Sequence, residues 1–354
     1  PRIAQFPARN RTFATAMNSP MNDQIAQTKI DLLPYRVLLY YLYTPITDVD
    51  VYRDEHHQFC LRHNLLGRVI VANEGLNGTV SGLAADCQAY MSWLHADPRF
   101  VAVDFKVEST EAHAFQKLHV RVKNEIVHSG FSVDPLRQTG IHLEPAEFKA
   151  LKDDPDVVLV DMRSKYEHEM GRFKGAITFE MDNLRELPEH VQEIEQFKNK
   201  KIITYCTGGI KCEKASAYLL ERGFRNVYQL HGGIIKYGLE QGGEDFEGVC
   251  YVFDNRLTTP VNRVNPTVIS HCHHCGTSTE RMVNCANPHC NDHIPLCAEC
   301  GQQLDGACSP ECQQHPDKRP YDGTGHYPRL TNGYSPWVGY LSRADAKPVE
   351  SLPS

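Results

Sequence analysis

The hydrophobic and polar positions of residues 34–130 follow two periods in turn, and together they predict a mixed α+β domain. A continuous apolar run, VLLYYLYTPI, predicts a buried strand, whereas DVDVYRDEHHQFCLRHNLL spaces its apolar residues as a helix does. Two strands joined by a turn are expected in GRVIVANEGLNGTVSG, because Asn-Glu-Gly and Asn-Gly favour the backbone conformations of turns. A second helix and further strands give the order β-α-β-β-α-β, which is typical of a ferredoxin-like, or acylphosphatase-like, domain.

The last predicted strand of this domain carries basic side chains at alternate positions. Because neighbouring residues of a strand point to opposite faces, all four should project from the same face of the sheet. We call the four residues the basic stripe: Lys117, His119, Arg121 and Lys123. Two interpretations remain open for them, an ordinary solvated surface or a site that binds the phosphates of a nucleic acid.

Strands and helices alternate from residue 153 to residue 247, after an expected linker with one short helix at 131–152. Apolar runs such as VVLVDMRS and KIITYC, separated by helices, indicate a parallel α/β sheet with helices on both faces. In sheets of this kind the reactive site lies at the carboxyl ends of the strands. Cys206 lies at such an end.

Cys206 begins a glycine-containing turn between a strand and a helix. The remaining residues of this loop are Thr207, Gly208, Gly209, Ile210, Lys211 and Cys212. The glycines expose successive backbone N–H groups to the sulfur, and the positive end of the following helix adds to their effect. The pKa of Cys206 is therefore expected to fall, as a nucleophile requires. The alternative is a buried structural cysteine, for which two consecutive glycines would be a costly loop.

The spacing within this loop disfavours a cysteine phosphatase. Such an enzyme needs an arginine six positions after the cysteine, where its planar fork binds the phosphoryl oxygens. Cys212 occupies that position, and Lys211 comes one residue too early. Cys212 is expected either to resolve an oxidised or persulfidated Cys206 through a disulfide, or to be a packing residue of the helix.

Eight of the 13 cysteines form four closely spaced pairs within residues 248–314. The pairs are Cys272 and Cys275, Cys285 and Cys290, Cys297 and Cys300, and Cys308 and Cys312. Such pairs are typical ligands of structural zinc, and eight thiolates fill two tetrahedral sites. The spacing matches neither ferredoxin pattern of iron–sulfur clusters. We therefore expect a zinc module folded by two ions, with the pairs either interleaved or taken in sequential order.

The charge and composition limit the possible partners. A formal net charge of −7 gives no general attraction to polyanions, so a nucleic acid would have to bind a local basic patch. No apolar run approaches the ~20 residues that span a bilayer. The absence of a recognisable secretory signal, together with the metal-type cysteines, favours the cytoplasm. The polar, aperiodic residues 1–33 and 315–354 are expected to be a disordered extension and a disordered tail.

The sequence around Cys206 resembles a rhodanese domain. The resemblance rests on the loop CTGGIK, on LVDMRSKYEHEMGRFKGA before it and on VYQLHGGIIKYG after it. It implies that Cys206 carries a persulfide and that Asp161, Arg163 and Glu167 stabilise the loop. Arg172 stands where that family usually has a histidine.

A wider resemblance covers residues 34–312. The succession of ANEGLNGTVSG, YCTGGIKCEKAS and HCHHCG is similar to that of the bacterial tRNA uridine hydroxylase family, which commonly has arginine in place of Lys211. The resemblance implies an oxidoreductase that uses molecular oxygen to hydroxylate carbon 5 of the wobble uridine in the anticodon region of tRNA. It also implies that Cys206 is the essential residue.

The residues themselves leave the source of the oxygen chemistry open, because the sequence contains no flavin or nicotinamide fingerprint. Two other functions remain alternatives. One is a sulfurtransferase that passes sulfane sulfur from a small donor to a thiol acceptor, and the other is a regulatory scaffold whose zinc module recruits a partner.

Overall fold

The structure is a computed structural model that describes residues 33–327. Its first sheet has five strands in the order β4-β1-β3-β2-β5. These strands are β1 (Tyr35–Tyr43), β2 (Leu66–Ala72), β3 (Gly75–Leu83), β4 (Lys106–Thr110) and β5 (Leu118–Val122). All neighbours run antiparallel except the edge strand β5, which runs parallel to β2. The order of the first four strands confirms the predicted ferredoxin-like domain.

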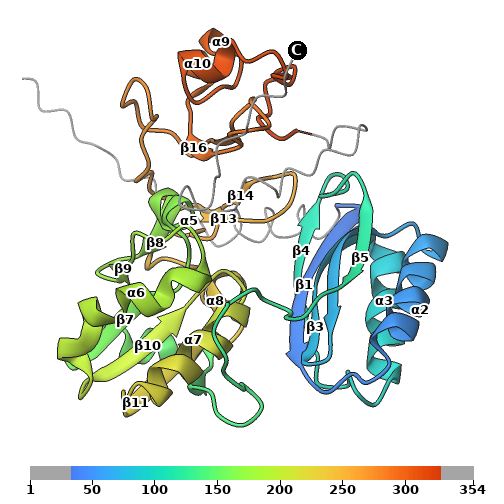
Figure 1. The fold of residues 1–354 in the computed structure, drawn as a ribbon, viewed down its shortest axis with the longest axis vertical. Helices are drawn as coiled ribbons and strands as arrows, with labels where there is room; N and C mark the ends of the chain where they lie inside the picture. The colour runs from blue at the N-terminus through green and yellow to red at the C-terminus, as the bar shows by residue number, and fades with distance from the viewer. Residues whose placement is uncertain (1–32, 328–354) are drawn as a thin grey trace, which may run out of the picture.

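Two helices cover one face of this sheet, and its other face is turned toward the second domain (Figure 1). The helices are α2 (Val49–Arg62) and α3 (Ala84–Ala96). Alternation along β1 separates the two faces. Leu38 and Tyr40 lie in the core beneath the helices, whereas Leu39 packs against the core of the second domain.

The second sheet is entirely parallel and has the order β6-β11-β10-β7-β9. Its strands are β6 (Ile141–Leu143), β7 (Val157–Asp161), β9 (Ile177–Thr178), β10 (Lys201–Tyr205) and β11 (Asn226–Leu230). Consecutive residues Ile202 and Ile203 of β10 enter different core clusters. This is the pattern of a parallel sheet whose two faces are both covered, which confirms the predicted α/β domain.

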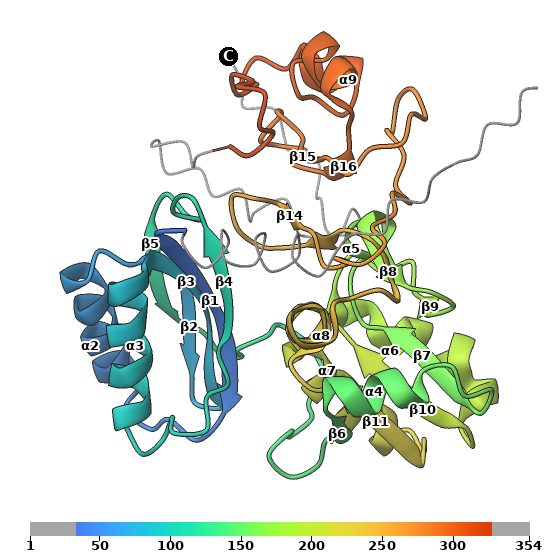
Figure 2. The same cartoon turned by 180° about the vertical axis from the view of Figure 1, so that it is seen from behind.

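Helices lie on both sides of the second sheet (Figure 2). They are α4 (Pro145–Leu151), α5 (Lys165–Met170), α6 (Leu187–His190), α7 (Ile210–Glu221) and α8 (Gly233–Gln241), with 3-10 turns at Leu184–Glu186 and Val191–Phe197. A short ribbon of β8 (Gly171–Phe173) and β12 (Phe246–Gly248) pairs beside them.

The segment predicted to be a linker, 131–152, differs from that expectation in its second half. Strand β6 pairs with β11 at the edge of the parallel sheet, and α4 packs on α8 through the fully buried Phe148. The three residues of β6 are too few for a hydrophobic period, and Ile141 is exposed. The second domain therefore begins near residue 141, earlier than the predicted residue 153.

The chain after β12 first passes between the two domains and then forms the cysteine-rich module (Figures 1 and 2). The passage contains β13 (Cys250–Tyr251) and β14 (Thr258–Thr259), and the module contains β15 (Met282–Asn284), β16 (His293–Pro295), α9 (Ala298–Gln303) and α10 (Pro310–Gln313). The small apolar clusters of the module consist largely of cysteines.

The predicted disordered tail, 315–354, requires a correction for residues 315–327. The buried Arg319 donates hydrogen bonds to the carbonyl oxygens of Cys285 and Ala286, and its guanidinium lies 4.2 Å from the centre of the Tyr327 ring. These polar contacts hold the segment on the module, and a hydrophobic period does not reveal them. The rest of the predicted tail and residues 1–32 of the predicted N-terminal extension lie outside the described residues.

Between residues 33 and 327, the structure contains no helix that is both long enough and apolar enough to cross a membrane.

Candidate active site

The Cys206 loop occupies the carboxyl end of β10, at the start of α7. Gly209 precedes the helix with a φ of 100°, a left-handed conformation that favours glycine. A Cβ atom at this position would also lie 2.9 Å from the Tyr41 hydroxyl. The backbone N–H of Gly209 donates to Cys206 Sγ at 3.2 Å. The glycine thus allows both the close approach of the first domain and the amide contact with sulfur.

The surroundings of Cys206 favour its thiolate. The side chain is only 2% exposed, and this burial alone would raise its pKa. A hydrogen bond from the Cys212 thiol, the charge of Lys211 and the backbone N–H groups of Lys211 and Gly209 outweigh burial and lower the pKa of Cys206 to about 7. A substantial fraction of the thiol is therefore ionised near neutral pH, in the direction expected from the loop sequence.

Cys212 is the partner of this thiolate inside the protein core. It is fully buried and packs in the same apolar cluster as Cys206. Burial, followed by the hydrogen bond and the negative charge of Cys206, raises the pKa of Cys212 well above its usual value. Cys212 therefore remains a protonated donor to the Cys206 sulfur.

The three residues expected to support the loop lie close together at and just after the end of β7, the strand that pairs with β10. Arg163 and Asp161 form a fully buried ion pair, with Nη2 of the arginine 2.7 Å from Oδ2 of the carboxylate. The same Nη2 donates to the carbonyl oxygen of Gly171 at 2.6 Å. This arrangement fixes the turn after β7, because the buried charges are paired and hydrogen-bonded.

Glu167 connects α5 to both ends of the loop. Its carboxylate accepts hydrogen bonds from the Ser164 backbone N–H at 3.0 Å and from the Thr207 hydroxyl at 3.3 Å. It also forms an ion pair with Lys211 Nζ. Since Glu167 is fully buried, these donors hold its charge in a single place and orient Lys211 beside the loop.

The face of the first sheet that carries no helices covers the loop. Leu39 lies against Gly208, and Tyr41 lies against Gly209. The buried side chain of Lys106, at the start of β4, lies above the Tyr41 ring with its Nζ 5.2 Å from the ring centre. The site around Cys206 is therefore built by both domains.

Two buried charges of α7 attach the helix to the first domain. Glu213 accepts a hydrogen bond from the Tyr41 hydroxyl at 2.9 Å. Lys214 is 2% exposed, and its Nζ lies 3.0 Å from Glu74 Oε1 and 2.9 Å from Glu125 Oε2. Sequence reasoning missed this attachment, although the adjacent charges of Glu213 and Lys214, followed by the largely apolar ASAYLL, were a signal for it.

The basic stripe lies on the same sheet face as the residues that cover Cys206. The strand register aligns His119 with Arg68, Thr79 and Leu39 across β5, β2, β3 and β1. Lys117 and Lys123 are exposed, and the other two members of the stripe, His119 and Arg121, are partly buried. The stripe thus faces the region where the two domains meet.

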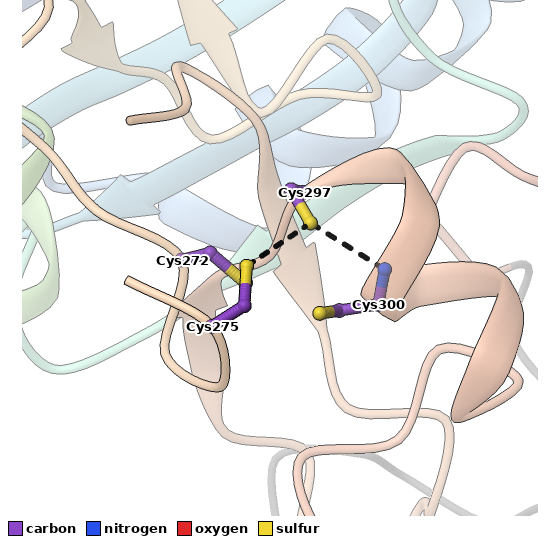
Figure 3. A group of neighbouring side chains, drawn as sticks. All are labelled: Cys272, Cys275, Cys297 and Cys300. Atoms are coloured by element: carbon purple, nitrogen blue, oxygen red, sulfur yellow. Dashed lines mark hydrogen bonds between the residues drawn. The ribbon is translucent and has the colours of Figure 1, made fainter. Parts of the chain in front are cut away.

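The eight paired cysteines form two groups of four in interleaved order. One group is Cys272, Cys275, Cys297 and Cys300, and the other is Cys285, Cys290, Cys308 and Cys312. All sulfur atoms of a group lie within 4.8 Å of one another. Figure 3 shows the first group, in which the Sγ atoms of Cys275 and Cys297 are 3.7 Å apart.

These sulfur separations fit a tetrahedral metal site. A tetrahedron with zinc–sulfur bonds of about 2.3 Å has sulfur–sulfur edges of about 3.8 Å. In the second group, Cys308 Sγ lies 3.6 Å from Cys290 Sγ and 3.6 Å from Cys312 Sγ. Both groups can therefore hold an ion with four thiolates and no vacant position.

Three domain families match successive parts of the chain. Residues 35–126 match the UPF0176 acylphosphatase-like domain, residues 144–240 match the rhodanese-like domain, and residues 247–313 match the family described as rhodanase C-terminal. The first two matches correspond to the two sheet domains, and the third corresponds to the segment that contains the cysteine module.

Curated proteins resemble the chain over most of its length. A tRNA uridine(34) hydroxylase of Cytophaga hutchinsonii is 63% identical over 305 residues, which cover 86% of this chain and 98% of that protein. Proteins of the same name from Staphylococcus haemolyticus and Streptococcus uberis are 47% and 46% identical, covering 72% and 71% of this chain and 81% and 79% of their own lengths.

Proposed function

Because this chain belongs to the tRNA uridine(34) hydroxylase family, we propose that it hydroxylates carbon 5 of the wobble uridine in tRNA. The observation that carries the proposal is the similarity to the Cytophaga hutchinsonii protein over 98% of that protein's length. The loop around Cys206 supports it, because a buried thiol with a pKa of about 7 is prepared for covalent or redox chemistry. A wobble uridine suits such a site, since an unpaired base can be turned into a pocket at modest cost.

We propose molecular oxygen as the source of the hydroxyl oxygen, and the two thiols of the site as the source of electrons. Insertion of one oxygen atom into the C5–H bond leaves the second atom to be reduced to water, which takes two electrons and two protons. The thiolate of Cys206 and the thiol of Cys212 supply both electrons and one proton by becoming a disulfide, and the second proton comes from water. A small thiol reductant then restores the pair by disulfide exchange.

Support for the dithiol comes from the hydrogen bond between the two cysteines and from their unequal pKa values. The lower pKa of Cys206 makes it the sulfur that reacts first, and Cys212 retains its proton until the disulfide forms. Their burial in one apolar cluster protects the pair from bulk solvent.

A simple sulfurtransferase is less well supported by the contacts of the site. Such an enzyme would need only the parallel α/β domain, whereas here Leu39 and Tyr41 of the first domain lie against the glycines of the loop. A regulatory scaffold would not need a thiol whose pKa is lowered. We place the enzyme in the cytoplasm, where its tRNA substrate is found.

The proposed activity is tested by analysing tRNA nucleosides from a bacterial strain that lacks its own uridine hydroxylases. Expression of the wild-type chain should restore 5-hydroxyuridine-derived nucleosides at the wobble position, as measured by liquid chromatography and mass spectrometry. Cys206→Ser, produced at the same level, serves as the matched control and should restore none. Absence of the nucleoside with the wild-type chain would exclude the proposed activity.

We propose structural zinc for the two groups of four cysteines, and the tetrahedral sulfur separations support it. The metal would supply folding energy to a module that has little apolar core, with no part in the chemistry at Cys206. The module is attached beside the active site, because the Tyr251 hydroxyl and His293 Nδ1 are 3.0 Å apart and the His293 ring stacks on Tyr166, next to Glu167.

Elemental analysis of freshly purified, reduced protein should find about two zinc ions per chain, as expected from four thiolates per tetrahedral site. A chelator that removes them should unfold the cysteine module before the other domains. Near-zero zinc, or iron with visible charge-transfer absorption, would contradict the assignment.

A further inference from the structure

One exposed aromatic ring stands at the edge of the Cys206 loop. Phe253 has 40% of its surface exposed, and it is the only aromatic residue among the exposed large hydrophobic side chains of residues 33–327. It follows β13, directly after Cys250, Tyr251 and Val252, which are all buried. The chemistry proposed for the site gives this ring no role.

Contacts from both domains position Phe253. On one side, the centre of its ring lies 5.6 Å from Nζ of Lys211, the lysine that Glu167 orients beside Cys206. On the other side, Arg68 Nη1 of the first domain donates to the backbone carbonyl of Phe253 at 3.3 Å. The Tyr251 ring packs against it edge-on at 5.1 Å. Phe253 is therefore held by contacts within the protein itself.

The segment that follows is attached equally firmly to the first domain. The backbone N–H of Asn255 donates to the carbonyl oxygen of Ala114 at 2.9 Å, and Arg256 pairs with Glu108 of β4 at 3.2 Å. A segment attached to the first domain thus carries an exposed ring to the place where the two domains meet. Rigid aromatic rings present a binding surface at little cost in conformational entropy.

The neighbours of the ring identify the chemistry of its occupant. A lipid or an apolar peptide would need a wider hydrophobic patch, and single exposed hydrophobic residues are by themselves ordinary. Here Lys211 Nζ lies beside the ring, and the Arg68 guanidinium binds the backbone carbonyl of the same residue. An aromatic platform flanked by cations is the arrangement by which proteins bind unpaired nucleotides, through base stacking and phosphate contacts.

We propose that the uracil ring of the wobble nucleotide stacks on Phe253 when it enters the Cys206 site. This inference rests on the proposed function, and it makes Phe253 a positioning residue that acts on the substrate base. Stacking on this ring orients the base beside the loop. The contribution of stacking is realised only with the RNA bound.

The test compares substitutions that separate stacking from simple packing. Phe253→Leu keeps an apolar side chain but removes the aromatic face, and Phe253→Tyr keeps that face. We expect Phe253→Leu to lower kcat/KM for tRNA roughly 5- to 150-fold, the range of one base–aromatic stack. Phe253→Tyr should retain activity within about threefold of wild type. Leu61→Ala, an exposed position on the outer helix α2, should leave kcat/KM unchanged.

A second readout distinguishes stacking from the alternative role of holding Lys211. If the ring served only to place that lysine, Phe253→Leu would raise the pH at which iodoacetamide modifies Cys206, because Lys211 lowers the pKa of Cys206. We expect this pH dependence, followed by peptide mass spectrometry, to be the same as in wild type. A shift toward higher pH in Phe253→Leu would overturn the proposal.

A photochemical cross-link locates the base directly. Irradiated tRNA with 4-thiouridine at the wobble position should cross-link to the peptide that contains Phe253, and the same label at the next anticodon position should not. A cross-link from the next position alone, or equal activity of Phe253→Leu and wild type, would overturn the inference while leaving the hydroxylase activity intact. Inactivity of the wild-type chain would instead remove the proposed function on which the inference rests.

Discussion

The attachment of α7 to the first domain yields a quantitative prediction for Lys214→Met. This change keeps most of the side-chain length but removes the charge between Glu74 and Glu125. Loss of one partner of a buried ion pair costs about 3–5 kcal/mol. Because both carboxylates retain 24% exposure and water can solvate them in part, we expect a loss of about 2–3 kcal/mol in the free energy that holds the domains together.

The effect should be visible at the active site as well as in stability. When the first domain separates from α7, Leu39 and Tyr41 no longer cover the Cys206 loop. We therefore expect the midpoint of thermal unfolding to fall by roughly 5–10 °C, and Cys206 to react faster with iodoacetamide. Lys198→Met is the matched control, because its ion pair with Glu195 lies at the surface of the second domain and is worth about 0.2–1 kcal/mol.

The stability that Lys214 provides should depend on pH, and the lowered pKa of Glu125 gives the direction of this dependence. Burial raises the pKa of Glu125, but hydrogen bonds from Lys214 and Ser129 outweigh it and lower the pKa to about 2. A carboxylate with a lowered pKa in the folded state stabilises the protein above its unfolded pKa of about 4.3, and this stabilisation is lost as the pH falls toward 2. The difference between wild type and Lys214→Met should shrink over the same range.

Two results would refute this reasoning. One is an unfolding midpoint and Cys206 reactivity of Lys214→Met that match those of Lys198→Met. The other is a failure of Glu125→Gln to restore part of the stability in the Lys214→Met background, since that change removes a carboxylate left without its lysine.

The remaining predictions concern chemistry and RNA binding. Modification of Cys206 by iodoacetamide in the wild-type chain should rise with pH and reach half its maximum near pH 7, because the thiolate is the reactive form; a midpoint near the usual thiol value would contradict the described surroundings. Cys212→Ser should keep the fold, and it should still bind tRNA but lose multiple turnover with a thiol reductant, as measured by product formed per enzyme; full turnover would exclude the proposed dithiol. Replacement of Lys117, Arg121 and Lys123 by alanine should weaken tRNA binding and reduce the slope of log affinity against log salt by roughly 0.7–0.9 per lost phosphate contact. An unchanged slope in a fluorescence titration would assign the basic stripe to ordinary surface.

The sequence predicted the parts of the site that lie close together along the chain. The strand, the glycines and the helix around Cys206 are local features, and so are the four cysteine pairs. The alternation in the basic stripe also predicted a shared sheet face, and Leu118 and Val120 indeed pack toward the core. In each case a short run of residues contains the whole physical argument.

The parts that could not be predicted depend on contacts between distant residues. Nothing local indicates that Tyr41 lies over Gly209, or that Glu74 reaches Lys214 from another domain. Strand β6 is too short to show a period, and its place at the sheet edge depends on β11. The grouping of the cysteine pairs likewise depends on the fold of the module, which brings pairs that are distant in the sequence together.

The most direct test of the central claim uses purified chain, tRNA with a wobble uridine, a thiol reductant and ¹⁸O-labelled molecular oxygen. We predict 5-hydroxyuridine at the wobble position with the label in its new hydroxyl group, and no product with Cys206→Ser. Unlabelled product from an ¹⁸O₂ atmosphere, or labelled product from the Cys206→Ser variant, would contradict the account.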